Sequence, residues 1–224
     1  MERLYECAVV GIEEAAPGVR RMAVERPPGL KWLPGQDLAV ELPGSTGRTA
    51  WYAIAIAPEV AGPLEIFVDV TRRGVGPSYM GQLAVGQTLR FRAPVGDFFL
   101  DRAPGAPLVL AGVGLGIVAL RPMVQRLLRH RLAFPLRVHH FIQDLTQQLF
   151  RPELVREVFR HEQFEYELLF DLPVVDYLYG RYVGGTVERN WIFYLCGPGP
   201  DVRNAGELLI DAGYPQGAIH LQQW

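Results

Sequence analysis

Trp191-Ile-Phe-Tyr-Leu-Cys-Gly-Pro-Gly-Pro200 is the stretch that decides the fold. A continuous apolar run leads into a Cys-Gly-Pro turn, and the pattern after it predicts a helix over 201–212. An apolar run of this length between turn residues is typical of a buried strand in a parallel sheet. Ligands of open parallel sheets bind beyond the carboxyl ends of the strands. Cys196, Gly197 and Pro198 are therefore candidate site residues.

The second half of the chain alternates strand patterns with helix patterns. The sequence predicts strands at 107–111, 136–141, 164–170, 191–195 and 218–221, and helices at 117–130, 151–161 and 201–212. Because strands and helices alternate, we expect a doubly wound parallel sheet of the Rossmann-like type.

The first hundred residues consist of short apolar runs separated by Pro and Gly turns. The sequence predicts strands at 5–12, 20–26, 37–42, 50–57, 64–71 and 88–93, and one short helix at 77–83. This spacing favours an antiparallel β-barrel of the Greek-key type. The stretch 101–106 is rich in turn formers and is the expected linker. The sequence thus predicts two domains, 1–100 and 107–224.

Composition excludes several classes of protein. The chain has 224 residues, 49% of them hydrophobic, and a net charge of −2, which gives no reason to expect nucleic acid or an anionic membrane as partner. Cys7 and Cys196 are too few to ligate an iron–sulfur cluster, and they form no disulfide framework, so we expect a reducing, cytoplasmic location. The longest uncharged stretch, 103–120, is broken by prolines and glycines, so no membrane span is expected. No metal site is expected either.

Four short segments of the first half carry Pro and Gly in a recognisable order. They are Leu33-Pro-Gly-Gln36, Ala50-Trp-Tyr-Ala-Ile-Ala55, Arg73-Gly-Val-Gly-Pro-Ser78 and Ala93-Pro-Val-Gly-Asp-Phe-Phe-Leu100. In this order they resemble the flavin domain of the ferredoxin–NADP reductase superfamily. The resemblance implies bound FAD, whose diphosphate and flavin ring would contact two sets of residues: Gly76, Pro77 and Ser78 for the diphosphate, and Tyr52, Ala53 and Ile54 for the ring.

The chain departs from the family's flavin pattern at two positions. Ala50 stands where the family has an arginine that pairs with the flavin diphosphate, and Ala53 stands where it has a Ser or Thr that hydrogen-bonds the ring. A charge-assisted hydrogen bond contributes about 1.5–3 kcal/mol, so its loss weakens binding without abolishing it. Arg48, Arg72 or Arg73 could supply the missing charge.

The second half carries a glycine turn, Val113-Gly-Leu-Gly-Ile-Val-Ala119, between a strand and a helix. It resembles the family's dinucleotide turn, with Gly114 and Gly116 retained and Leu115 in place of a threonine. The Cys-Gly-Pro stretch resembles the family's nicotinamide signature. The resemblance implies that Cys196 lies beside the nicotinamide and shapes the hydride path at the flavin N5. A terminal aromatic often covers the flavin ring in this family, so Trp224 either does this or packs on the barrel.

A further departure concerns the family's Tyr-Gly-Ala-Arg strand end, which aligns with His140-Phe-Ile-Gln143. Phe141 replaces the glycine and is expected to obstruct the adenosine slot, and Gln143 replaces an arginine that grips the adenosine phosphate. Two interpretations stay open: altered nucleotide binding, for example NADH without recognition of a 2′-phosphate, or loss of the nucleotide site. His139 and His140 are adjacent on the expected strand and point to opposite faces. We expect one to be buried and the other exposed.

The resemblance covers nearly the whole chain and implies a flavoprotein oxidoreductase. Electrons would pass between NADH or NADPH and a protein or small-molecule acceptor through FAD, with Cys196 as the catalytic candidate. A redox partner protein would have to carry any iron–sulfur centre. The alternative is a non-catalytic or electron-relay subunit of a larger redox complex, which keeps the fold without oxidising NAD(P)H itself. The sequence leaves open the acceptor, the choice of nucleotide, the direction of electron flow and the oligomeric state.

Overall fold

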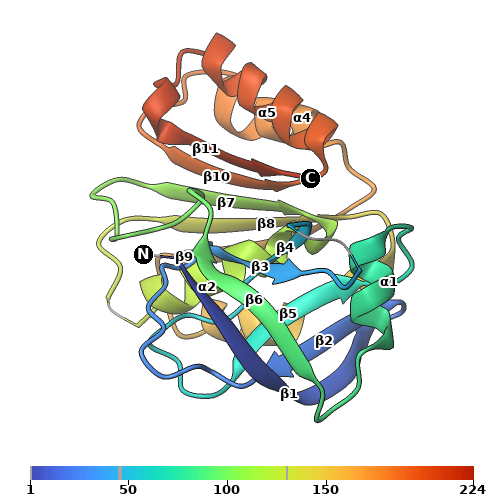
Figure 1. The fold of residues 1–224 in the computed structure, drawn as a ribbon. Helices are drawn as coiled ribbons and strands as arrows, with labels where there is room; N and C mark the ends of the chain where they lie inside the picture. The colour runs from blue at the N-terminus through green and yellow to red at the C-terminus, as the bar shows by residue number, and fades with distance from the viewer. Residues whose placement is uncertain (1, 45–46, 130) are drawn as a thin grey trace. The chain divides into compact units, whose positions relative to one another are not determined.

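The computed structural model of the chain describes residues 2–44, 47–129 and 131–224, and it divides into two units (Figure 1). Unit 1 comprises Met1–Asp101 and Arg121–Arg126, and unit 2 comprises Arg102–Leu120 and Leu127–Trp224. Each unit has a hydrophobic core of its own. The division places 121–126 with unit 1, whereas the sequence assigns these residues to the second domain. In the described part of the chain, no helix is both long and apolar enough to cross a membrane.

The described part of unit 1 forms one antiparallel sheet of six strands in the order β4-β3-β6-β1-β2-β5. Strand β6 shows why its sequence forms a half-buried strand, because Leu89, Phe91 and Ala93 are buried while the residues between them are exposed. Beyond the end of β4, the Ala55 N–H donates to the Glu65 carbonyl on β5 at 2.8 Å. The strands and helix α1 have these bounds: β1 Arg3–Ala16, β2 Val19–Val24, β3 Asp37–Glu41, β4 Thr49–Ala53, β5 Leu64–Asp69, β6 Thr88–Val95 and α1 Val75–Gln82.

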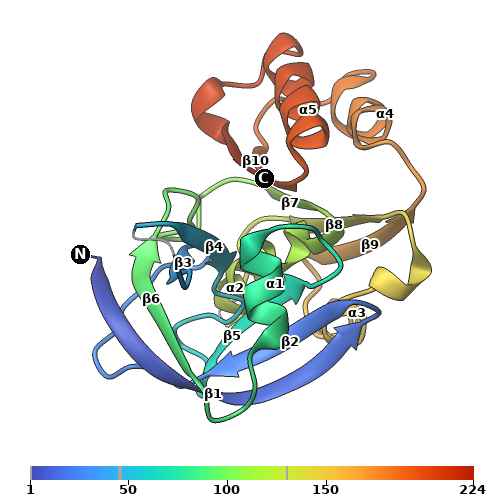
Figure 2. The ribbon, with the colours of Figure 1, turned by 45° about the vertical axis from the view of Figure 1, so that its right-hand side comes forward.

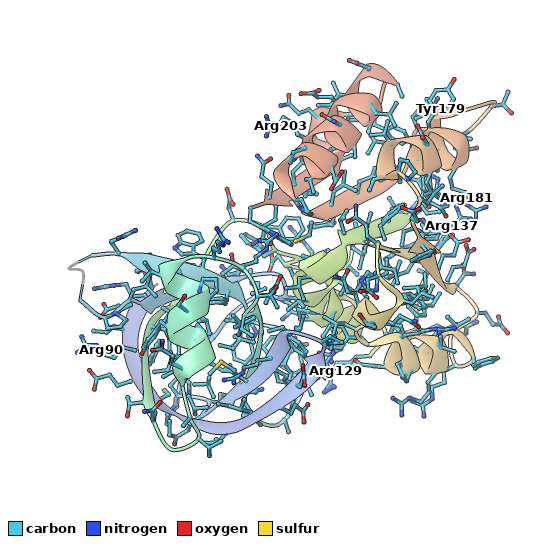
Figure 3. The ribbon with its side chains drawn as sticks, turned by 90° about the vertical axis from the view of Figure 1, so that its right-hand side faces the viewer. Arg90, Arg129, Arg137, Tyr179, Arg181 and Arg203 are labelled. Carbon is cyan, nitrogen blue, oxygen red and sulfur yellow. The ribbon has the colours of Figure 1, made fainter. Side chains whose placement is uncertain are left out.

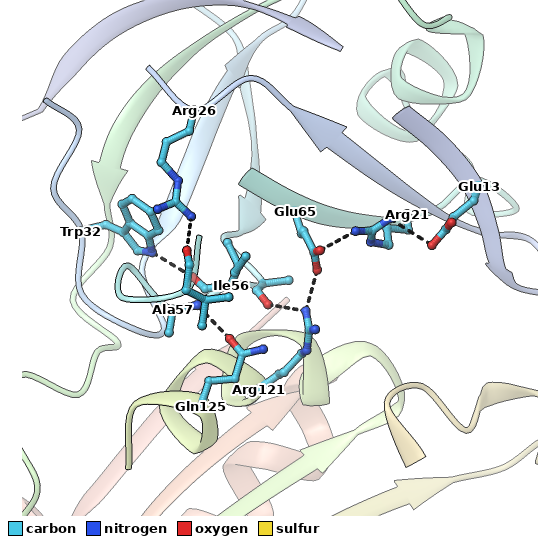
Figure 4. A network of polar contacts seen from close by, with 11 residues as sticks. Glu13, Arg21, Arg26, Trp32, Ile56, Ala57, Glu65, Arg121 and Gln125 are labelled. Carbon is cyan, nitrogen blue, oxygen red and sulfur yellow. Dashed lines mark hydrogen bonds and ion pairs between the residues drawn. The ribbon is translucent and has the colours of Figure 1, made fainter. Parts of the chain in front are cut away.

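A buried charge network lies within unit 1 (Figure 4). The carboxylate of Glu65 accepts hydrogen bonds from the guanidinium groups of Arg21 and of Arg121, the second at 2.6 Å. Arg121 also donates to the Ala55 carbonyl at 2.9 Å, and Glu13 pairs with Arg21 at 3.0 Å. Glu65 is buried, so its charge depends on these two arginines for compensation.

Unit 2 is built on a parallel sheet of five strands in the order β11-β10-β7-β8-β9. This order, with the first strand in the middle and the chain turning back from it, is that of a doubly wound fold, so the prediction is confirmed. Its strands are β7 Leu108–Val113, β8 Leu136–Ile142, β9 Phe164–Phe170, β10 Ile192–Gly197 and β11 Ile219–Gln223.

Four helices connect these strands. Helices α4 and α5 lie on the same side of the sheet and contribute apolar residues to one core with β10 (Figure 2). The helix expected over 117–130 ends at Leu127, and His130 lies outside the described residues. The helices are α2 Ile117–Leu127, α3 Arg151–Val158, α4 Val174–Leu178 and α5 Gly199–Asp211.

Helix α4 and the π-helical turn after it, Tyr179–Val183, have no counterpart among the predicted elements. Tertiary packing holds them. The fully buried Tyr182 ring makes edge contacts with Trp191 and Phe193, and the Arg189 guanidinium donates to the Tyr182 carbonyl at 2.7 Å. The sequence of this stretch has no regular spacing of apolar residues, because the single Tyr182 ring makes much of its contact with the core.

Charged residues flank this turn on the outer part of unit 2. Figure 3 shows Arg137 and Arg181 next to each other, and both guanidinium groups donate to the Glu165 carboxylate, at 2.9 and 3.4 Å. The Arg137 guanidinium also lies over the Trp191 ring, 4.5 Å from its centroid. Two cations on one carboxylate tie the start of β8 and of β9 to the π-helical turn.

Both histidines of β8 are fully buried, so the expectation that one is exposed is wrong. β8 lies inside the sheet, with β7 on one side and β9 on the other, and both histidines are 0% exposed. The two side chains do point to opposite faces. His139 contacts Tyr182 and Glu167, and His140 contacts the Gly114 carbonyl. Among the residues that the structure describes, no group of three or more His, Cys, Asp or Glu could hold a metal.

Candidate functional site

The predicted flavin residues of unit 1 meet where β4 packs against the first turn of α1. Gly74 has φ +148° and leads into the helix. A Cβ on Gly76 would lie 2.9 Å from the Ala50 Cβ and 3.1 Å from the Tyr52 hydroxyl oxygen. Only glycine allows so close an approach of helix to strand. The structure thus brings Gly76, with Pro77 and Ser78 in the same turn, next to Tyr52.

The Tyr52 hydroxyl has no hydrogen-bond partner among the described residues, although its oxygen is buried. Burial raises the pKa of Tyr52 to about 12. An unpaired buried hydroxyl costs about 1–3 kcal/mol, so a ligand atom is the expected partner. The N-terminus of α1 beside it carries no side-chain cap and no acidic residue in its first turn. Such a helix end attracts phosphate, so this part of unit 1 suits the diphosphate-bearing FAD.

Gln36 joins three of the four family-like segments. Its side-chain carbonyl accepts from the Leu33 N–H at 2.8 Å, its amide donates to the Gly96 carbonyl at 3.2 Å, and its backbone carbonyl accepts from the Ile54 N–H at 3.1 Å. These bonds fix the end of β4, where Ile54 is fully buried and Ala53 is half-buried. Contact of these two residues with a flavin ring stays a prediction.

The unpartnered hydroxyl leads to a prediction for Tyr52→Phe. The apoprotein should unfold at the same or a higher urea concentration, because a buried polar group without a partner is removed. FAD should bind about 3- to 10-fold more weakly, because a hydrogen bond to the ligand contributes about 0.5–1.5 kcal/mol. Fluorescence titration of FAD with the apoprotein measures this. Tyr5→Phe, a half-buried tyrosine of β1, should leave FAD affinity unchanged. A Tyr52→Phe protein that is less stable but binds FAD normally would assign the hydroxyl a structural role.

The glycine turn of unit 2 lies between β7 and α2. At each of its three glycine positions, a different feature of the structure favours glycine. A Cβ on Gly112 would lie 2.6 Å from the backbone nitrogen of Ile117, where α2 begins. Gly114 has φ +55°, and a Cβ there would meet nothing within 4 Å. A Cβ on Gly116 would lie 1.9 Å from the carbonyl oxygen of Cys196. The turn therefore packs tightly on β10 and leaves open space at Gly114.

Cys196 lies at the carboxyl end of β10, between Gly112 of β7 and Gln222 of β11. It is fully buried, and its thiol faces the Gln222 side-chain oxygen at 3.8 Å. The chain end returns to the same place, because the Trp224 N–H donates to the Gly197 carbonyl at 3.4 Å and the Gly199 N–H donates to the Trp224 carbonyl at 3.2 Å. The Trp224 side chain is 48% exposed.

The sequence and the structure of this chain are both similar to those of known oxidoreductases. Residues 7–100 match the family described as "Oxidoreductase FAD-binding domain". The chain is 27% identical over 238 residues to "Ferredoxin--NADP reductase B" of Sorangium cellulosum (strain So ce56), covering 98% of this chain and 97% of that protein. It matches the structure of a ferredoxin NADP+ reductase from Neisseria gonorrhoeae with bound FAD and NADP at a TM-score of 0.85 and 17% identity, covering 98% of both chains. The first half of the chain therefore matches an oxidoreductase FAD-binding domain, and the whole chain is similar to ferredoxin–NADP reductases.

Other relatives are longer than this chain. "Phenol hydroxylase P5 protein" of Acinetobacter pittii (strain PHEA-2) is 23% identical over 240 residues, which cover 98% of this chain and 65% of that protein. The solved structure of Amycolatopsis cytochrome P450 reductase GcoB matches at a TM-score of 0.83 and 22% identity, covering 99% of this chain and 70% of that one. The chain spans about two-thirds or less of several such relatives, down to 39% of a flavohemoprotein.

Phe141, one of the departures from the family's pattern, is 2% exposed and packs edge-on against Tyr177, with ring centroids 5.5 Å apart. Its ring belongs to the core with α4, and obstruction of the adenosine slot stays a prediction. Gln143 follows the end of β8 and is exposed.

Sequence reasoning missed three residues of the nucleotide turn and its surroundings. His140 donates to the turn, Gly112 allows the turn to close on α2, and Gln222 faces the Cys196 thiol. A signal existed for Gly112, since it begins the Gly-x-Gly-x-Gly pattern. The other two could not be found, because their partners are 26 residues away in the sequence.

Proposed function

We propose that this chain passes electrons from NADH or NADPH, through bound FAD, to a protein acceptor. The proposal for the flavin rests on the Tyr52 hydroxyl, whose buried oxygen has no hydrogen-bond partner among the described residues and lies beside the uncapped N-terminus of α1. Bound FAD supplies the redox chemistry, since it can take up a hydride and pass on electrons. The side chains and backbone of this protein bind and orient the two nucleotides.

In unit 1, the first turn of α1 is proposed to hold the FAD diphosphate, with the backbone of Gly76 and Pro77 and the hydroxyl of Ser78. Two properties support this: the helix end is free of an acidic residue, and the glycine lets the helix approach β4 closely. Tyr52 would contact the ring system, together with the backbone of Ala53 and Ile54.

In unit 2, the turn over Gly114, Leu115 and Gly116 is proposed to bind the diphosphate of NAD(P)H at the start of α2. The positive φ of Gly114 and the open space beside it support this. The nicotinamide would contact the stretch of Cys196, Gly197 and Pro198. Trp224 is bonded to this stretch through its backbone and is proposed as an aromatic cover for a ring.

A redox protein is the proposed electron acceptor. Similar proteins are named as components of larger systems, such as the "Anthranilate 1,2-dioxygenase electron transfer component" of Acinetobacter baylyi, which is 24% identical over 184 residues. With only two cysteines in the chain, a four-thiolate iron–sulfur cluster would have to be carried by the acceptor. The two cysteines form no disulfide with each other, which suits reducing conditions and favours a cytoplasmic location.

Absorption spectra of the purified protein, before and after anaerobic addition of NADH and of NADPH, test this function. We expect a flavin band that bleaches with at least one of the two nucleotides. A flavin band that ignores both would favour the relay subunit, which receives electrons from another protein. No flavin band after incubation with FAD would contradict the proposal altogether.

Ala50→Arg tests the placement of the FAD diphosphate. The Ala50 Cβ faces Gly76 in the first turn of α1, so a guanidinium at this position would reach the proposed phosphate site. We expect FAD to bind about 10- to 100-fold more tightly, because a charge-assisted hydrogen bond contributes about 1.5–3 kcal/mol. Trp51→Arg is the control, since it adds the same charge on the opposite, exposed face of β4. Equal FAD affinity in Ala50→Arg and wild type would contradict the placement of the FAD diphosphate at the first turn of α1.

A further inference from the structure

We propose that His140 is a positioning residue that orients the Gly114–Leu115 peptide for binding the diphosphate of NAD(P)H. The inference rests on the proposed function, which places that diphosphate at the glycine turn. It assigns a role to a residue of β8 that lies outside the turn and outside the Cys-Gly-Pro stretch.

The contact itself fixes the protonation of the imidazole. The Nε2 atom of His140 lies 3.0 Å from the Gly114 carbonyl oxygen. A carbonyl oxygen only accepts hydrogen bonds, so Nε2 carries the proton and donates. Nδ1 then carries none, and it is buried with no hydrogen-bond partner among the described residues. Burial lowers the pKa of His140 to about 4, although the bond to the Gly114 carbonyl opposes this shift. At neutral pH the side chain therefore acts as an uncharged donor.

The bond has a consequence for the opposite side of the peptide. In a trans peptide the carbonyl and the following N–H point in opposite directions. Because His140 holds the Gly114 carbonyl toward β8, the Leu115 N–H is directed away from β8. Gly114 has φ +55°, and a Cβ on it would meet nothing within 4 Å, so space for a ligand exists next to this peptide. An N–H held there before the ligand arrives binds a phosphate oxygen without loss of backbone freedom.

Packing within the glycine turn does not restrain the Gly114–Leu115 peptide. A Cβ on Gly112 or on Gly116 would clash with the backbone of Ile117 or of Cys196, so both glycines are closely packed. Gly114 lies between them, has no side chain and meets no such contact. Glycine is the residue with the greatest backbone freedom. The imidazole of His140 supplies the restraint that the sequence of the turn lacks.

His139 provides a matched control on the same strand. It is as buried as His140 but lies on the other face, where it bonds the Tyr182 hydroxyl at 2.6 Å and the Glu167 carboxylate at 3.0 Å. Replacing either histidine removes a buried donor and lowers stability. Only replacement of His140 should affect the glycine turn.

The test uses the 224-residue chain with FAD. It measures steady-state oxidation of the nucleotide that reduces the protein, with ferricyanide as acceptor. We expect His140→Phe to raise the KM for that nucleotide about tenfold and to leave kcat within about twofold. His140→Gln, which keeps a donor amide, should recover part of the loss. His139→Gln should lower the melting temperature and leave the KM unchanged. Inhibition by ADP-ribose, which carries the diphosphate without the nicotinamide, should weaken in parallel with the rise in KM.

The outcomes separate this inference from the function on which it rests. If wild type is reduced by NADH or NADPH and His140→Phe shows an unchanged KM and unchanged inhibition by ADP-ribose, the positioning role is wrong and the function stands. An equal rise in KM for His139→Gln would also overturn it, since general destabilisation would then explain the effect. If neither nucleotide reduces wild type, both the function and the inference fail. If His140→Phe does not fold, the KM for the nucleotide is compared between His140→Leu, which lacks a donor, and His140→Gln, which keeps one.

Discussion

Gly116→Ala is expected to lower the stability of unit 2 by about 3 kcal/mol and to abolish most oxidation of NAD(P)H. The added Cβ would lie 1.9 Å from the Cys196 carbonyl oxygen and 2.6 Å from its carbonyl carbon. Both atoms belong to the backbone of a central strand, so no side chain can move aside. The turn must instead shift by about an ångström. A displacement of this size at a binding turn lowers catalysis by about a hundredfold.

Two other glycine substitutions separate crowding from loss of backbone freedom. Gly217→Ala adds a methyl group that meets nothing within 4 Å and should leave stability and KM unchanged. Gly114→Ala also meets nothing, but its φ of +55° costs about 1–2 kcal/mol for an L-residue. It should raise the KM, because the methyl group occupies the space left for the ligand. Thermal melting and steady-state kinetics measure these effects. A Gly116→Ala protein with wild-type melting temperature and KM would contradict the packing of the turn on β10.

The sequence predicted the elements whose signal is local. The apolar run before Cys196 is strand β10, the predicted strand at 164–170 is β9, and the glycines of the nucleotide turn lie between a strand and a helix. Apolar period and turn residues are properties of neighbouring residues, so they can be read without the fold. The antiparallel first half and the doubly wound second half followed from them.

The elements that the sequence missed depend on residues far apart in the chain. The π-helical turn is held by Tyr182 packing on Trp191 and Phe193, and the burial of both histidines follows from the central place of β8. Phe141 lies in the predicted strand, but its place in the core beside Tyr177 of α4 could not be read from its neighbours. None of these contacts leaves a periodic signal.

Some residues of the candidate site could likewise be predicted from local motifs, and others could not. Tyr52, Gly76, Gly114 and Gly116 could be named from local motifs, and the structure gives a physical reason for each of the three glycines and for the hydroxyl. The bond from His140 to the turn could not be predicted, because it joins residues 26 positions apart. His139 and His140 are equally buried, and only their hydrogen-bond partners distinguish them.

Glu65→Gln is expected to lower the free energy of unfolding by about 3 kcal/mol at pH 7, because it leaves two partly buried guanidinium groups without their shared carboxylate. Arg21 and Arg121 both donate to Glu65, and Arg121 comes from a segment 56 residues further along the chain (Figure 4). Glutamine keeps the shape and one acceptor oxygen but removes the charge. Urea unfolding of the apoprotein, followed by fluorescence of the nearby Trp32, measures the loss. Glu13→Gln removes only the exposed partner of Arg21 and should cost less than about 1 kcal/mol.

The same comparison at low pH tests the cause of the stabilisation. Burial alone would raise the pKa of Glu65, but the hydrogen bonds and charges of Arg21 and Arg121 outweigh it and lower the pKa below its ordinary value of 4.5. A carboxyl group with a lowered pKa in the folded state stabilises the protein above that ordinary value, and this contribution is lost as the pH falls through the folded-state pKa. The difference between wild type and Glu65→Gln should therefore be full at pH 7 and shrink below pH 4.5. A difference that stays the same from pH 7 to pH 3 would show that Glu65 acts through its shape and packing, and that its charge contributes nothing.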